Sequence, residues 1–148
     1  MLKIYLDNCC YGRPFDDLSQ DKIQNEVTAK TFIQALIKYK CITLYYSFMT
    51  LAELEDHPFA DSKAHILDFI ENNATAFIGE YHVDTLKKMT DEIMQTGIKI
   101  KDATHLACAI FAKCDYFITT DKQVIKHKTD KINIVNPIEF MKIWRESI

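Results

Sequence analysis

The chain has 148 residues, of which 48% are hydrophobic and 26% are charged. This length and balance predict a single globular domain, residues 1–148, that can bury a core without disulfides or structural metal. The net charge of −3 and the pI near 5.9 argue against a protein that grips nucleic acid by bulk positive charge, because such domains typically have a pI above about 9.

The five cysteines include the adjacent pair Cys9 and Cys10 and form no Cys-x-x-Cys motif. An odd number of thiols, with no basic stretch and apolar run at the N-terminus, predicts reduced cysteines and a cytoplasmic location. No apolar run approaches the roughly 18 residues of a membrane-spanning helix, so no membrane association is expected.

The hydrophobic pattern predicts strands that alternate with helices. Residues 2–6 are typical of a buried strand, and a loop containing Gly12 and Pro14 follows them. The further elements expected in chain order are a helix over 21–38, a strand over 41–46, a helix from about 50 to 56, helices over 61–72, 83–96 and 101–113, a strand over 116–119, a helical turn over 121–127, a strand over 132–135 and a helix over 137–144. Strands joined through helices predict an α/β fold: a three-layer α/β/α domain with a mostly parallel sheet of four to five strands.

Several kinds of active site are excluded by composition. The three glycines lie far apart, so no glycine-rich loop can cradle a phosphate, and nucleotide-dependent kinases and Rossmann oxidoreductases are not expected. No serine lies in a Gly-x-Ser-x-Gly elbow, and the histidines do not combine with cysteines at zinc-binding spacing. The acidic residues remain as the candidates for chemistry.

Four acids, Asp7, Glu53, Asp102 and Asp121, stand where predicted strands end or helices begin. The carboxyl ends of parallel strands share one edge of a sheet, so these side chains could meet in one crevice. Each acid also has a structural interpretation. Asp7 fits an Asx turn, Glu53 fits a capping box with Thr50, and Asp102 and Asp121 fit helix N-caps.

Two carboxylates about 5 Å apart repel each other by roughly 3 kcal/mol at an effective dielectric constant near 20. Four carboxylates in one pocket therefore require protons or a cation. Oxygen ligands favour hard cations such as Mg²⁺ or Mn²⁺ over zinc. Such an ion can activate a water molecule for attack on a phosphodiester, and it would supply positive charge that the chain itself lacks.

Five stretches carry a resemblance to a known family. They are YLDNCCYGRPFD (5–16), LAEL (51–54), KDATHLACA (101–109), DYFITTD (115–121) and NPIEF (136–140). In order and spacing the chain resembles PIN-domain proteins, close to the toxin ribonucleases of toxin–antitoxin pairs. The resemblance implies a central parallel sheet, a Mg²⁺ or Mn²⁺ cofactor, single-stranded RNA as substrate, an antitoxin partner and a homodimer. It maps the family's metal-binding and catalytic acids onto Asp7, Glu53, Asp102 and Asp121.

Asn8, Arg13, Thr119 and Thr120 are the candidates for contact with substrate, through phosphate or bound water. Each has an ordinary alternative, because Asn8 and the threonines fit a turn or a strand end, and Arg13 fits an ion pair with nearby aspartates. His105 shares a helical face with Asp102, and a satisfied core histidine is the simpler interpretation. Residues 99–128 carry six lysines and three aspartates, which fits either a solvated surface or an RNA-facing rim.

Three functions are compatible with these features. The first is a PIN-fold endoribonuclease in which metal held by the four acids activates water. The second is a non-catalytic scaffold that binds protein or RNA, supported by Lys122, which stands where many family members carry a further acid. The third is a phosphatase with Asp7 as nucleophile, although Cys9 stands where such enzymes usually have a second acid.

Overall fold

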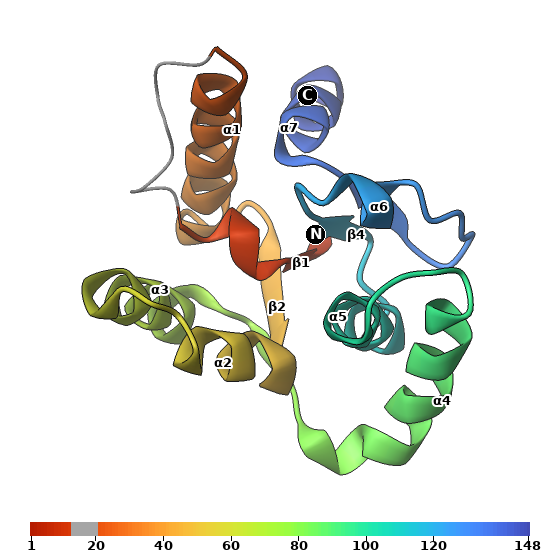
Figure 1. Ribbon diagram of the computed structural model, residues 1–148. Coiled ribbons are helices and arrows are strands. Elements are labelled where there is room, and N and C mark those ends of the chain that lie inside the picture. Colours follow the sequence, from red (N-terminus) through yellow and green to blue (C-terminus); the bar gives the residue numbers. More distant parts are fainter. Residues whose placement is uncertain (13–20) are drawn as a thin grey trace.

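The computed structural model describes residues 1–12 and 21–148 of the chain (Figure 1). The strands of these residues are β1 (Lys3–Leu6), β2 (Thr43–Ser47), β3 (Ala76–Ile78), β4 (Tyr116–Ile118) and β5 (Asn133–Val135). The helices are α1 (Asp21–Lys38), α2 (Phe48–Glu55), α3 (Ala60–Asn73), α4 (Val83–Met94), α5 (Ile100–Phe111), α6 (Lys122–Ile125) and α7 (Pro137–Glu146), with the short 3-10 helices η1 (Asn8–Cys10) and η2 (Glu80–His82).

The five strands form one sheet in the order β3-β2-β1-β4-β5, and every neighbouring pair is parallel. β1 lies at the centre, where Tyr5 pairs with Tyr45 of β2 on one side and with Phe117 of β4 on the other. Helices cover both faces of this sheet, as parallel strands require. The predicted three-layer α/β/α architecture is therefore confirmed.

Each face of the sheet packs against its own hydrophobic core, because successive strand residues point to opposite faces. Ile4 and Leu6 belong to a cluster that includes Phe140 of α7, whereas Tyr5 and Phe117 belong to a second cluster under α4 and α5. Figure 1 shows α1 beside α7 and α4 beside α5, in agreement with the contacts between these helices. Asp7 follows directly on β1, so the first predicted acid is anchored between the two cores.

The start of α2 differs from the prediction. Ser47 is the N-cap and its Oγ accepts from Met49 N at 3.2 Å, while Thr50 Oγ1 accepts from Ser47 N at 3.1 Å. The capping box therefore joins Ser47 to Thr50, and the predicted box between Thr50 and Glu53 is wrong. Because α2 begins at Phe48, Glu53 lies beyond the first turn and its carboxylate is free of any capping role.

The remaining boundaries agree with the sequence to within a few residues, with one omission. β3 was not predicted, because three residues are too few to show an alternating pattern. α4 ends at Met94, two residues before the predicted end, and the glycine expected to close it, Gly97, adopts a φ of +99° in the turn that follows. All five cysteines are free thiols. Within the described residues, none of the helices combines the length and apolar character that crossing a bilayer requires.

Candidate metal centre

The strand order reverses between β1 and β4, at the centre of the sheet. After β1 the chain builds β2 and β3 on one side, and it then returns to build β4 and β5 on the other side. Ligand sites of open parallel sheets lie at such a reversal of strand order. Asp7 and Thr119 occupy it, because they follow β1 and β4 directly, and Asp7 N donates to Ile118 O at 2.9 Å.

Both oxygens of the Asp7 carboxylate are held in place. Oδ1 accepts from Asn8 N at 2.8 Å, and Oδ2 accepts from the hydroxyl of Thr119 at 2.7 Å. The Thr119 hydroxyl also accepts from Asp121 N at 3.1 Å, so it joins the segment after β4 to the segment after β1. Asp7 and Thr119 are buried. Asp7 accepts from the next residue and caps η1, whereas an Asx turn would join it to the backbone two residues on. These bonds fix the direction of the carboxylate.

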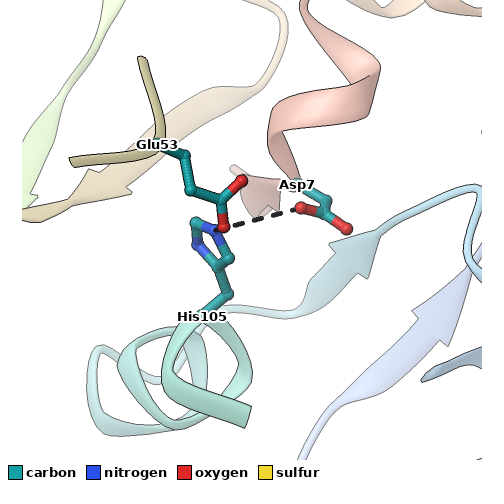
Figure 2. A group of neighbouring side chains, drawn as sticks. All are labelled: Asp7, Glu53 and His105. Carbon is teal, nitrogen blue, oxygen red and sulfur yellow. Dashed lines mark hydrogen bonds and ion pairs between the residues drawn. The ribbon is translucent and has the colours of Figure 1, made fainter. Parts of the chain in front are cut away.

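The side chain of Glu53 extends from α2 toward the same edge of the sheet, where it contacts His105 of α5 (Figure 2). His105 Nε2 lies 2.7 Å from Glu53 Oε1 and 4.0 Å from Asp7 Oδ1. One ligand atom from each of the three side chains lies within 4.8 Å of the other two. The side chains come from three separate elements, so the tertiary fold itself assembles the group.

His105 is fully buried and satisfied at both ring nitrogens. Its Nδ1 lies 2.6 Å from the hydroxyl of Tyr5, which lies in turn 2.6 Å from Ser47 Oγ and 3.2 Å from Thr50 Oγ1. Burial, followed by the nearby Cys108 thiol, raises the pKa of Tyr5 well above its usual value, so this hydroxyl keeps its proton. The expectation of a satisfied core histidine is confirmed, and the same histidine contacts a predicted metal ligand.

Asp102 lies in the first turn of α5 and is half-buried. Its predicted role as N-cap is wrong, because Lys99 occupies the cap position. The pKa of Asp102 is raised from 3.8 to about 6. Partial burial is the largest cause, and the negative charges of Asp7, Asp121 and Glu53 act in the same direction, whereas His105 lowers the pKa. All four predicted acids therefore interact electrostatically in one neighbourhood.

Asp121 is exposed and caps α6, with Oδ1 accepting from Gln123 N at 2.9 Å and from Val124 N at 3.4 Å. The capping interpretation is thus confirmed for Asp121. Its charge nevertheless acts on Asp102. A carboxylate can cap a helix through one oxygen and present the other elsewhere, so the cap does not exclude a metal-binding role.

The four predicted substrate contacts have different surroundings. Asn8 Nδ2 donates to Thr50 O at 3.0 Å and ties η1 to α2. The half-buried Thr120 donates to Cys9 Sγ at 3.2 Å, and Thr119 supports Asp7 from a buried position. Arg13 lies outside the described residues. Contact of these side chains with substrate stays a prediction.

The donor set fits a divalent cation. Carboxylate oxygens from Asp7 and Glu53 face the same point, and two further carboxylates contribute negative charge. The negative charges of Asp7, Asp121 and Glu53 add to the effect of burial in raising the pKa of Asp102. A cation of charge +2 would relieve the repulsion, and carboxylate oxygens favour Mg²⁺ or Mn²⁺.

Sequence reasoning missed Tyr5 and gave His105 only a core role. The available signal for His105 was its position three residues after Asp102, which places both side chains on one side of α5. No local pattern connects His105 to Glu53, because 52 residues separate them.

The fold is shared with solved structures of low sequence identity. VapBC2 from Rickettsia felis, solved with a DNA fragment from its promoter, matches with a TM-score of 0.56 and 17% identity over 91% of this chain and 98% of that chain. FitAcB from Neisseria gonorrhoeae matches with a TM-score of 0.55 and 17% identity over 90% and 97% of the two chains. PAE2754 from Pyrobaculum aerophilum matches with a TM-score of 0.55 and 13% identity over 99% of this chain and 97% of that chain.

No protein-family model matches the chain, and no curated protein matches it. The structural matches establish a PIN-like fold, as the resemblance of the five sequence stretches implied. At these identities they carry the fold alone.

Proposed function

We propose that the chain is a divalent-metal-dependent ribonuclease that hydrolyses phosphodiester bonds of single-stranded RNA. The observation that carries the proposal is the meeting of Asp7 and Glu53 at the carboxyl edge of the sheet, with Asp102 and Asp121 near enough for their charges to interact. Asp7 and Glu53 face each other across His105, and the charges of Asp7, Glu53 and Asp121 act on Asp102. Helix capping alone does not account for this convergence, because only Asp121 caps a regular α-helix.

Asp7 and Glu53 would hold Mg²⁺ or Mn²⁺, with Asp102 and Asp121 as further ligands or as ligands of bound water. When bound, the ion would lower the pKa of a water molecule and offset the charge of the phosphodiester. Hydrogen bonds from the Thr119 hydroxyl and from Asn8 N fix the orientation of the Asp7 carboxylate. With its pKa near 6 in the metal-free protein, Asp102 accepts a proton more readily than an ordinary aspartate.

The surface beside Asp102 and Asp121 carries exposed lysines, which supports RNA as the substrate. Lys99 precedes α5, and Lys122 is the first residue of α6. Gln123 Nε2 donates to Gly97 O at 3.2 Å, so the segments that bear these lysines are joined. Ammonium groups on this rim can contact the phosphates that flank the scissile bond.

A protein partner and a cellular location complete the proposal. The fold neighbours VapBC2 and FitAcB are toxin–antitoxin proteins, which supports a role for this chain as the toxin of such a pair, with a cognate antitoxin as partner. Free thiols at all five cysteines agree with a reducing compartment, so we place the protein in the cytoplasm. The proposal includes a homodimer, on the resemblance alone.

The experiment compares wild type with Asp7→Asn and Asp102→Asn in RNA cleavage and in calorimetry with MnCl₂. We expect cleavage that requires Mg²⁺ or Mn²⁺, loss of cleavage in both variants, and heat of Mn²⁺ binding that depends on Asp7. The matched control is Asp130→Asn, an exposed aspartate before β5 and therefore at the opposite edge of the sheet. It should behave as wild type.

Two outcomes would favour the rival functions. Absence of Mn²⁺ heat and of cleavage in the folded wild-type protein would indicate a scaffold. Turnover of a small phosphoester without cleavage of oligonucleotides would indicate a phosphatase. Loss of the native fold in Asp7→Asn would mean that Asp7 is chiefly structural, because asparagine keeps the volume but has only one of the two acceptor oxygens that Asn8 N and Thr119 use.

A further inference from the structure

A chain of buried hydrogen bonds leads from the sheet interior to the candidate metal centre. The Tyr5 hydroxyl lies 2.6 Å from Ser47 Oγ and 3.2 Å from Thr50 Oγ1. The same hydroxyl lies 2.6 Å from His105 Nδ1, and His105 Nε2 lies 2.7 Å from Glu53 Oε1. Every member before Glu53 is buried, and Tyr5 and His105 are completely inaccessible to solvent. A buried polar chain of this length costs free energy unless each group is satisfied, so its geometry is tightly specified.

The donors and acceptors of this chain can be assigned in one consistent direction. Ser47 Oγ already accepts from Met49 N and Thr50 Oγ1 accepts from Ser47 N, so both hydroxyl protons are available to the Tyr5 oxygen. Tyr5 then donates to Nδ1 of His105. The Nε2 atom carries the ring proton and donates to Oε1 of Glu53, because an ionised carboxylate only accepts.

We propose that Tyr5 and His105 are positioning residues, which fix one oxygen of Glu53 so that the other is presented to the cation beside Asp7. This rests on the proposed function, in which Glu53 is a metal ligand. Glutamate has three rotatable side-chain bonds, and fixing them in advance lowers the cost of ordering the carboxylate when the cation binds. In this arrangement the Nε2 atom of His105 donates its proton to Glu53 Oε1, so it has no lone pair for the cation and is not itself a ligand.

The arrangement parallels the way in which Asp7 is held. Asp7 receives hydrogen bonds from Thr119 and from Asn8 N, and Glu53 receives its hydrogen bond from His105. Groups that orient metal ligands typically contribute about 10- to 100-fold to metal affinity or activity. Loss of the Tyr5 hydroxyl should therefore weaken the binding of the cation, although the ring of His105 lies between Tyr5 and Glu53.

The test measures Mn²⁺ affinity by calorimetry in His105→Leu, His105→Gln and Tyr5→Phe. Leucine fills the space of the ring without a donor, whereas glutamine restores an N–H near the position of Nε2. We expect the dissociation constant of Mn²⁺ to rise about 10- to 100-fold in His105→Leu and Tyr5→Phe, and to return toward the wild-type value in His105→Gln.

Tyr11→Phe is the matched control, because Tyr11 is also buried and its hydroxyl has no hydrogen-bond partner among the described residues. It should leave the Mn²⁺ affinity unchanged. If His105→Leu does not fold, Tyr5→Phe against Tyr11→Phe still tests the proposal, since both substitutions remove one oxygen from a buried tyrosine. Thermal unfolding of the metal-free variants monitors the fold separately.

Electron spin-echo spectroscopy of the Mn²⁺ complex tests whether the imidazole is a ligand. We expect no directly coordinated nitrogen in the wild type. A nitrogen coupling that disappears in His105→Leu would overturn the positioning role and make His105 a ligand. Unchanged affinity in Tyr5→Phe and His105→Leu, with normal binding to wild type, would overturn this inference alone. Failure of wild type to bind Mn²⁺ would refute the proposed function, and this inference with it.

Discussion

Replacing Asp102 by asparagine should stabilise the metal-free protein at alkaline pH. The folded protein binds the Asp102 proton more tightly than the unfolded chain does, because its pKa rises from 3.8 to about 6 on folding. Protonation of Asp102 therefore favours the folded state below pH 4, and this contribution is lost as the pH rises through 6. Asparagine imitates the protonated form at every pH, so the variant keeps the contribution.

A shift of this size corresponds to roughly 3 kcal/mol if solvent screening is ignored. Asp102 is half-buried, so we reduce the expected effect to about 1–2 kcal/mol. The metal-free variant should therefore be more stable than wild type by about that amount at pH 8, with little difference at pH 4. For a chain of this size, such a difference corresponds to a rise in Tm of roughly 2–8 °C.

The assay is urea unfolding with a chelator present at pH 4.5, 6 and 8, with Asp130→Asn as a control for the loss of one exposed charge. Added Mn²⁺ should reverse the order at pH 8, because it stabilises wild type by binding to the folded state and binds the variant weakly. A stability difference that does not change with pH, or a variant less stable than wild type at pH 8 without metal, would refute the electrostatic interpretation of the four acids.

Two further predictions concern the surroundings of the site. Lys122→Glu should raise the dissociation constant for single-stranded RNA about 10-fold at low salt, as measured by fluorescence anisotropy in Mn²⁺. The slope of log affinity against log salt concentration should fall by about 1. An equal loss of affinity in Lys142→Glu, on the exposed side of α7, would show that the lysines beside Asp102 and Asp121 have no specific role. Iodoacetamide should modify Cys9 before Cys41, which is also exposed, because a hydrogen bond from Cys10 lowers the pKa of Cys9. The adduct should block cleavage, since Cys9 Sγ lies 4.0 Å from Thr119 Oγ1; peptide mapping by mass spectrometry that finds Cys41 labelled first would contradict this.

The elements predicted most accurately are those with a strong local pattern. α1 was predicted with its observed bounds, and the strand that precedes Asp7 was displaced by only one residue. The start of α2 was wrong because Thr50 and Glu53 satisfy the same local rule as Ser47 and Thr50. The choice between the two boxes depends on where β2 ends, and that position is set by pairing with β1 and β3.

The four acids could be selected from sequence because they flank strands and helices that the pattern identifies. The distances between these acids could not be predicted in the same way, because the distances depend on the strand order, in which β4 lies next to β1. The contact of Tyr5 with His105 spans 100 residues and lies inside the core. A buried tyrosine in a strand is ordinary core composition, so its hydroxyl gave no sign of its partner.

The buried position of Tyr5 has a thermodynamic consequence. Tyr5 packs in the hydrophobic cluster under α4 and α5, and its ring stacks on Phe117 at 5.5 Å between centroids. Breaking its bond to His105 thus requires opening the most protected part of the molecule, which ordinarily occurs only with global unfolding. The orientation of Glu53 should accordingly be as durable as the native state itself, although its carboxylate lies near the surface.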